Sequence, residues 1–99
     1  MTYALVSVVF PAVPVPPVSD GKRPIKLLAK YNYKANVDRP GGFDELSLTQ
    51  GERLEFIQAH PINPFWWQAR NSEEQMGYVP ASYLMVNLIL LGLPVVGQV

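Results

Sequence analysis

In the stretch Ile25-Lys-Leu-Leu-Ala-Lys-Tyr-Asn-Tyr33, mostly apolar residues alternate, imperfectly, with mostly polar ones. One face carries Leu27, Ala29 and Tyr31, and the other carries Lys26, Leu28 and Lys30. A period of two residues is typical of a β-strand, because successive side chains of a strand point to opposite faces of a sheet. The stretch therefore predicts a β-sheet that begins near Ile25.

Segments rich in Pro, Gly, Asn and Asp divide the following residues into further short strands. Strands are expected at Arg53-Leu-Glu-Phe-Ile-Gln58, Phe65-Trp-Trp-Gln-Ala-Arg70, Met76-Gly-Tyr-Val79 and Leu84 to Val86. Loops are expected at Lys34–Glu45 and Ala59–Pro64, with a hairpin turn at Asn71–Gln75. Because no helix is available to cover a sheet face, these strands predict a small all-β barrel or sandwich.

The charge balance and the residue counts exclude several classes of function. Eight Lys and Arg residues balance eight Asp and Glu residues, so the chain lacks the basic excess that neutralises phosphates in nucleic-acid complexes. It has no cysteine, and His60 is its one histidine, so neither disulfides nor a zinc-finger ligand set is available. We expect one domain, no cofactor, no metal site and no nucleic-acid partner.

The apolar residues are concentrated toward the two ends of the chain. Every charged side chain lies between Asp20 and Glu74. We therefore divide the chain into a Pro-rich apolar segment at 1–24 that we expect to be flexible, a domain at 25–86 and an apolar tail at 87–99. A secretory signal is disfavoured at the N-terminus, because no basic residue precedes the apolar stretch and Pro11 interrupts it.

The C-terminal tail contains the run Leu88-Ile-Leu-Leu-Gly-Leu-Pro-Val-Val96. A transmembrane helix needs about 20 apolar residues, and this run is shorter and contains Gly and Pro. The alternatives are a frayed terminus, a segment that docks on the domain, a peripheral membrane contact, or the alternative end of a longer protein.

Four motifs, in order, resemble those of SH3 domains. They are Ala29-Lys-Tyr-Asn-Tyr33, Glu45-Leu-Ser-Leu-Thr-Gln-Gly-Glu-Arg-Leu54, the pair Trp66-Trp67 and Gly77-Tyr-Val-Pro-Ala-Ser-Tyr83. The resemblance covers residues 26–86 and neither tail. It implies a five-stranded, partly open barrel with RT, n-Src and distal loops and a short 3-10 turn before the last strand. It also implies a non-catalytic module that binds proline-rich peptides in the polyproline II conformation.

The resemblance assigns a peptide-binding surface to specific residues of this chain. Tyr31 and Tyr83 would flank a first groove for proline, and Tyr33, Trp66 and Pro80 would form a second. Tyr and Trp suit this role, since each combines a rigid apolar face with one hydrogen-bond donor. Phe56 and Trp67, by contrast, are expected in the core, because strand alternation turns Trp67 away from Trp66.

Acidic residues of the RT loop would set the orientation of the ligand. Family members use such acids to bind an Arg or Lys beside the Pro-x-x-Pro core, and Asp44 and Glu45 stand at the matching positions. The alternative is that both are solvated turn residues. The RT loop is longer here than in Src-type domains, and Arg39 could pair with either acid and compete with the arginine of a ligand.

Two further departures weaken a direct transfer of specificity. Lys30 replaces a Leu common in the family, and Asn32 replaces the usual Asp. The n-Src loop is also expanded, as His60-Pro-Ile-Asn-Pro64, with an apolar rim. The class of peptide therefore cannot be copied from a standard member.

The N-terminal segment itself contains the ligand motif twice, as Pro11-Ala-Val-Pro14 and Pro14-Val-Pro-Pro17. Prolines at this density favour an extended polyproline II conformation. Two hypotheses stay open: an internal ligand that occupies the groove at high effective concentration, or a flexible linker. Neither motif has an adjacent Arg or Lys for Glu45.

No arrangement of nucleophile, base and orienting acid is recognisable, so we expect a non-catalytic chain. The leading hypothesis is a monomeric cytoplasmic adaptor or signalling module that binds proline-rich partners with a flanking Arg or Lys. It could be cut from a larger signalling enzyme such as a tyrosine kinase. The second is a scaffold whose apolar C-terminal tail contacts a membrane or a hydrophobic partner.

Overall fold

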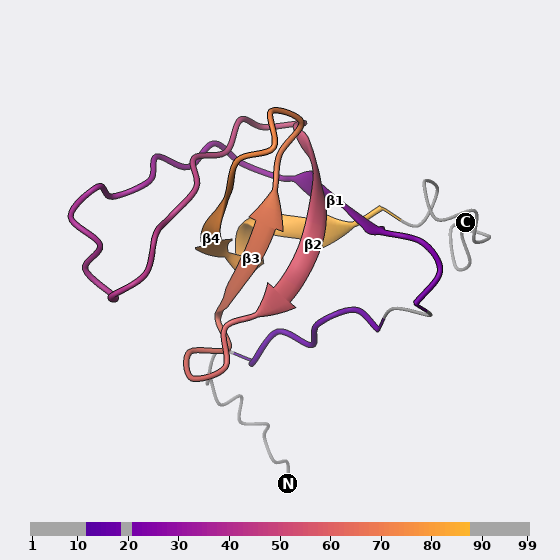
Figure 1. Cartoon of the computed structure of the whole chain (residues 1–99), viewed down its shortest axis with the longest axis horizontal. Coiled ribbons are helices and arrows are strands. Elements are labelled where there is room, and N and C mark those ends of the chain that lie inside the picture. Colours follow the sequence, from indigo (N-terminus) through magenta and orange to yellow (C-terminus); the bar gives the residue numbers. More distant parts are fainter. Residues whose placement is uncertain (1–11, 19–20, 88–99) are drawn as a thin grey trace, which may run out of the picture.

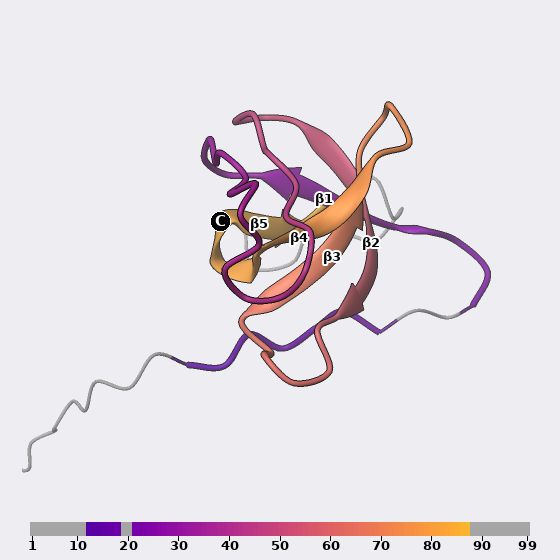
Figure 2. The same cartoon turned by 60° about the vertical axis from the view of Figure 1, so that its left-hand side comes forward.

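The computed structural model describes residues 12–18 and 21–87. Five strands form one antiparallel sheet in the order β4-β3-β2-β1-β5. The sheet curls on itself, and a short 3-10 helix, η1, joins the two edge strands (Figures 1 and 2). The strands are β1 (Ile25–Ala29), β2 (Arg53–Ala59), β3 (Trp66–Arg70), β4 (Met76–Pro80) and β5 (Leu84–Val86), with η1 at Ala81–Tyr83. The expected five-stranded barrel and its 3-10 turn are confirmed.

The inner face of β1 follows the predicted alternation. Ile25, Leu27 and Ala29 are buried, whereas Lys26 and Leu28 between them are half-buried. The strand ends at Ala29, earlier than the pattern through Tyr33 predicts. Beyond this point the chain leaves the sheet, and Tyr33 returns only as an isolated bridge to Leu48. Tyr31 and Tyr33 continue the alternation of the sequence but lie outside the strand.

The core lies inside the curl of the sheet. Leu27 and Val79 are fully buried there, and Trp67 is 5% exposed with Phe56 packed edge-on against its ring at 5.2 Å. The predicted core positions of Phe56 and Trp67 are therefore confirmed, although Phe56 is only half-buried. Burial leaves the indole Nε1 of Trp67 without a hydrogen-bond partner among the described residues, which costs roughly 1–3 kcal/mol.

The connection between β1 and β2, residues 30–52, is a long loop that extends to one side of the barrel (Figure 1). Its tip is two successive turns, closed by hydrogen bonds from Arg39 N to Asn36 O (3.4 Å) and from Gly42 N to Arg39 O (2.9 Å). Pro40 presets the second turn, and Gly42 supplies the φ of +83° that ends it. The cluster of breakers in the sequence is thus used at the tip of the loop.

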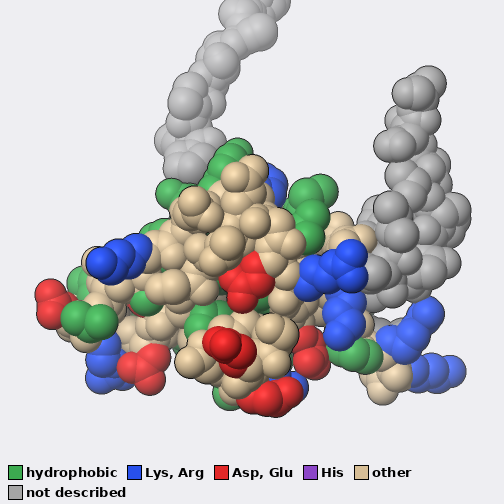
Figure 3. Space-filling view, turned by 90° about the horizontal axis from the view of Figure 1, so that it is seen from above, with side chains coloured by type: hydrophobic (Ala, Val, Ile, Leu, Met, Phe, Trp, Pro, Cys, Tyr) green, Lys and Arg blue, Asp and Glu red, His purple; other side chains and the backbone are tan. Residues whose placement is uncertain are grey.

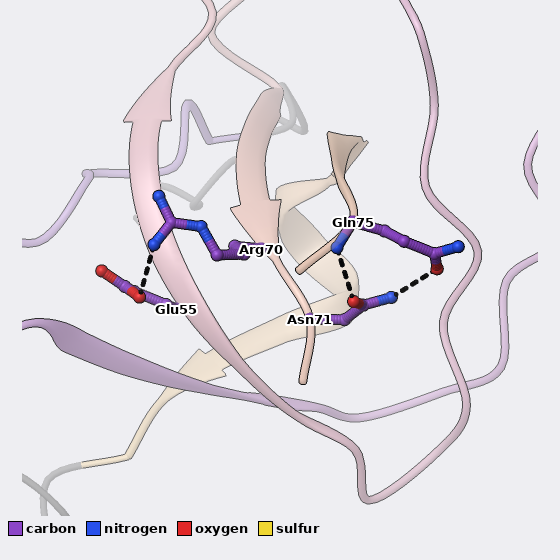
Figure 4. A network of polar contacts seen from close by, with 4 residues as sticks. All are labelled: Glu55, Arg70, Asn71 and Gln75. Atoms are coloured by element: carbon purple, nitrogen blue, oxygen red, sulfur yellow. Dashed lines mark hydrogen bonds and ion pairs between the residues drawn. The ribbon is translucent and has the colours of Figure 1, made fainter. Parts of the chain in front are cut away.

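The turn between β3 and β4, residues 71–75, is organised by one side chain. Asn71 Oδ1 accepts hydrogen bonds from the amides of Glu73 and Gln75, both at 2.9 Å. Asn71 Nδ2 donates to Gln75 Oε1 at 2.9 Å, and Figure 4 shows the two contacts between Asn71 and Gln75. This is the turn chemistry expected of Asn between two strands. Next to it, Arg70 on β3 donates to Glu55 on β2 at 3.2 Å (Figure 4). The hairpin turn predicted at 71–75 is confirmed.

Candidate functional site

Four aromatic side chains form a continuous row on one side of the barrel. The ring of Tyr83 lies between those of Tyr31 and Tyr33, with centroids at 5.3 and 5.6 Å, and the ring of Tyr33 meets that of Trp66 at 6.3 Å. All three contacts are edge-on, with interplanar angles of 72° to 84°. Neighbouring rings therefore stand nearly perpendicular, which creates walls and recesses rather than one flat sheet of aromatic surface.

Three separate elements position this row. Tyr31 and Tyr33 follow the end of β1, Tyr83 ends η1 and Trp66 begins β3. Lys30 N donates to Tyr83 O at 2.7 Å, which fixes the chain after β1 against η1. Pro80 lies opposite Trp66 in the register of β3 and β4. The five apolar residues predicted for the two grooves are thus brought together.

The row continues into a second aromatic cluster that the sequence did not reveal. Phe43 of the long loop is 8% exposed and packs on Trp66, His60 and Tyr78 with centroid distances of 4.9 to 5.1 Å. It joins the long loop to the 60–65 loop. The signal in the sequence was the glycine pair directly before Phe43, and the structure gives its reason, because a Cβ at Gly41 would stand 2.8 Å from that ring. A glycine permits this close approach.

His60 shapes the loop that bears it. Its Nδ1 accepts hydrogen bonds from the amides of Ile62 and Asn63 at 3.1 and 3.0 Å, while its ring packs on Phe43 and Tyr78. A side chain that accepts two backbone hydrogen bonds holds a turn in place. His60 therefore has a structural role in the 60–65 loop. Within residues 12–18 and 21–87, no cluster of His, Asp and Glu could hold a metal ion.

Glu45 is half-buried, and its side chain is held by two other residues of the long loop. Its Oε1 accepts hydrogen bonds from Tyr33 Oη at 2.7 Å, from Asn36 N at 2.8 Å and from Asn36 Nδ2 at 3.0 Å. Burial alone would raise the pKa of Glu45, but the hydrogen bonds from Asn36 and Tyr33 outweigh it and hold the pKa below 4.5. The three bonds converge on Oε1, so Oε2 lies outside this network.

The same contact changes the acidity of Tyr33. Burial, followed by the hydrogen bond to the Glu45 carboxylate and the charge of that carboxylate, raises the pKa of Tyr33 from 10.0 to about 12. Both shifts have one origin, because a phenol that donates to a carboxylate keeps its proton and the carboxylate keeps its charge. Tyr33 is therefore a fixed hydrogen-bond donor at neutral pH.

Asp44 is engaged from within the chain as well. Its Oδ1 lies 2.8 Å from Arg39 Nε, and Arg39 also donates to Gly42 O at 3.2 Å. Both side chains of the pair are exposed, Arg39 by 55% and Asp44 by 78%. Pairing of Arg39 with one of the two acids was anticipated, and the structure shows that the partner is Asp44. A hollow of about 380 Å³ opens beside the pair and is lined by Ala35, Asn36, Val37, Arg39, Asp44, Glu45 and Met76.

Charges of both signs are interspersed on the face seen from above the barrel. Figure 3 shows acidic side chains over the middle of this face, with Lys and Arg side chains on either side of them. No helix in the described ranges is long and apolar enough to cross a membrane. The predictions for the C-terminal tail concern residues beyond 87 and lie outside the described residues.

Comparison with known proteins identifies the family. The family model of the SH3 domain matches residues 28–81. The SH2/SH3 adapter protein dreadlocks of Drosophila melanogaster is 38% identical over 58 residues, which is 59% of this chain and 10% of that protein. The high osmolarity signaling protein SHO1 of Sporisorium reilianum (strain SRZ2) is 35% identical over 80 residues, 77% of this chain and 22% of that protein. The chain thus spans a tenth to about a fifth of the length of these relatives.

Solved structures agree on the fold. CED-2 superposes with a TM-score of 0.52 at 28% identity, over 64% of this chain and 33% of that one. The C-terminal SH3 domain of myosin IB from Entamoeba histolytica, solved bound to an EhFP10(GEF) peptide, superposes with a TM-score of 0.53 at 23% identity. That match covers 67% of this chain and 97% of the myosin domain. At this identity it supports the architecture alone.

Proposed function

Because this chain belongs to the SH3 domain family, we propose that its aromatic row binds proline-rich peptides in the polyproline II conformation. The observation that carries the proposal is the row Tyr31–Tyr83–Tyr33–Trp66, with edge-on contacts at 5.3 to 6.3 Å. A polyproline II helix has three residues per turn and no internal hydrogen bonds, so it presents preordered ridges that lose little entropy on docking. Perpendicular rings provide matching recesses.

The site assigned to the peptide consists of Tyr31, Tyr33, Asp44, Glu45, Trp66, Pro80 and Tyr83. Tyr31 is 54% exposed, although it packs against Tyr83. Tyr31 belongs to a contiguous row of at least partly exposed rings, and a contiguous exposed apolar patch is typical of an interaction site. We place the module in the cytoplasm as a monomeric, non-catalytic adaptor unit, in keeping with the adapter and signaling proteins among its relatives.

The contacts of the two acids bear on the choice of peptide. Arg39 already holds the Asp44 position that a flanking Arg or Lys of a ligand would use, and Glu45 offers only Oε2 outside its internal network. A flanking cation would therefore share the Asp44 carboxylate with Arg39, displace Arg39, or bind Glu45 Oε2. We propose that the proline ridges contribute most of the affinity and that the flanking cation chiefly sets direction.

The proposal is tested by titrating the full chain with a Pro-x-x-Pro-x-Arg peptide while amide chemical shifts are recorded. We expect shifts that concentrate at Tyr31, Tyr33, Trp66 and Tyr83, and none with a control peptide whose prolines are alanines. Tyr31→Ala should weaken binding at least about fivefold, as expected for an exposed aromatic contact worth over 1 kcal/mol. Met85→Ala is the matched control, because Met85 is 47% exposed on β5 outside the row. Equal effects of both variants would refute the assigned surface.

A further inference from the structure

The Pro-rich segment at residues 12–18 has a burial pattern with a period of three. Pro14 and Pro17 are half-buried, whereas the other five residues of the segment are exposed. Val15 and Val18 are 84% and 93% exposed. A polyproline II helix repeats every three residues, so Pro14 and Pro17 lie on the same edge. A free segment has no reason to protect one edge, and the pattern indicates that this edge faces the domain.

The segment lies on a defined part of the barrel. In both Figure 1 and Figure 2 the trace of residues 12–18 runs extended beside the 60–65 loop and below the end of β2. In Figure 1 the 60–65 loop stands between this segment and the long loop. The long loop in turn meets the aromatic row and the 60–65 loop through Phe43, which packs on Trp66 and His60. The segment is therefore beside the candidate groove but outside it.

We propose that Pro14-Val-Pro-Pro17 is a built-in strap, docked on the barrel end beside the 60–65 loop at a site separate from the peptide groove. The occupant is this chain's own segment, because its Pro14–Pro17 edge is protected as a pair while Val13, Val15 and Val18 face outward. The segment carries no charged side chain and therefore loses no ionic hydration on docking.

The strap has a mechanical consequence for the groove. The 60–65 loop is held on one side by His60, through its contacts with Phe43, Tyr78 and the amides of Ile62 and Asn63. In the proposed arrangement the strap lies along the outer side of the same loop. A loop with few contacts opens at low free-energy cost, and contacts on both sides raise that cost. The strap thus braces the loop that leads into Trp66 of the aromatic row, without entering the groove.

The test uses the full chain with isotope labels. We expect nuclear Overhauser effects between the ring protons of Pro14 and Pro17 and side chains of the 60–65 loop. Contacts to Tyr31, Tyr33 or Tyr83 instead would place the segment in the groove and overturn the proposal. Contacts seen only between differently labelled copies would assign the occupant to a second molecule and also overturn it. An absence of nuclear Overhauser effects from Pro14 and Pro17 to the domain would show that the segment is a free linker, which would also overturn the proposal.

Paired variants give an independent readout. Pro14→Glu combined with Pro17→Glu should shift the amides of the 60–65 loop and increase their fast motion in ¹⁵N relaxation. Val15→Glu combined with Val18→Glu adds the same charge on the exposed edges and should leave that loop unchanged. Identical effects of the two pairs would overturn the strap. Peptide titration is not involved, so failure here is separate from failure of the proposed groove.

Discussion

Glu45 has two possible roles, binding a cation of the ligand and holding the long loop in place. Its position matches an acid that would meet a ligand, but its Oε1 accepts three hydrogen bonds within the chain. The charge therefore stabilises the long loop first and is only partly available to a partner.

Glu45→Gln tests this internal role through the pKa of Tyr33. Removal of the negative charge and of the charge-assisted hydrogen bond should lower the Tyr33 pKa from about 12 toward 10, with burial keeping it above the ordinary value. The ¹³Cζ shift of Tyr33 followed between pH 8 and 13 measures it, and Asp44→Asn is the control. If the pKa of Tyr33 is the same in Glu45→Gln as in the parent chain, the Glu45 carboxylate is not a cause of the raised pKa.

The lowered pKa of Glu45 also predicts the pH dependence of stability. Because the folded pKa lies below the unfolded value, the contribution is present above about pH 4.5 and is lost as the pH falls through the folded pKa. Tyr33 has the opposite pH dependence. Because its folded pKa lies above the unfolded value, its contribution to the free energy of unfolding is present below about pH 10 and is lost as the pH rises toward 12. In urea unfolding from pH 7 to 2, Glu45→Gln should lose less stability than the parent chain.

Arg39 is the second residue whose role depends on a contact. Arg39→Ala should free Asp44 and increase affinity for an Arg-flanked proline peptide by up to about fivefold, since an exposed ion pair contributes about 0.2–1 kcal/mol. Titration calorimetry with Arg-flanked and Ala-flanked peptides measures the difference. The gain should be absent for the Ala-flanked peptide. A gain for both peptides would indicate a general change of the loop instead.

At the scale of elements, the 71–75 turn carries a local strain. Glu74 has a φ of +67°, a region that favours glycine. Glu74→Gly should raise the free energy of unfolding by about 0.5–1 kcal/mol after the entropy cost of glycine is subtracted. Glu74→Ala removes the same charge and keeps the Cβ, so it should not stabilise the chain. Equal stabilisation in both variants would point to charge rather than backbone strain.

Gly77 on β4 is required by the packing of the long loop on the sheet. A Cβ there would stand 2.9 Å from the backbone of Glu45 and Leu46. Gly77→Ala should therefore cost about 1–3 kcal/mol, as overpacking does, and weaken the bond from Leu46 N to Tyr78 O. Amide exchange at Leu46 reports that bond directly. Met76→Ala, at a neighbouring exposed position, should leave it intact.

At the scale of the whole molecule, stability depends on a small core. Leu27 is fully buried on β1, and Leu28 beside it is half-buried on the opposite face. Leu27→Ala should cost about 2–5 kcal/mol, which is a large part of the free energy of unfolding of a domain this small. Leu28→Ala should cost clearly less. Urea midpoints with a constant slope measure both, and equal losses would contradict the inward orientation of Leu27.

Most of the fold could be predicted from the sequence, because strands and turns depend on local properties. The bounds of β5 and the turn at 71–75 agree with expectation, since alternation and Asn chemistry act within a few residues. The end of β1 at Ala29 could not be predicted, because the alternation continues where the pairing does not. Tyr31 and Tyr83 could be placed together only through the family resemblance, since they are far apart in the chain.

The sequence by itself determined the strands, the loops, the neutral charge and the residue types of the site, because each follows from short-range pattern or composition. Only the tertiary structure decided which contacts the residues of the site make. It packs Phe43 of the long loop on His60 and Trp66, pairs Arg39 with Asp44, fixes Glu45 Oε1 on Tyr33 and Asn36, and leaves Pro14 and Pro17 half-buried in an otherwise exposed segment. These contacts lie within the long loop or join it to other parts of the chain, so no short-range sequence pattern specifies their geometry.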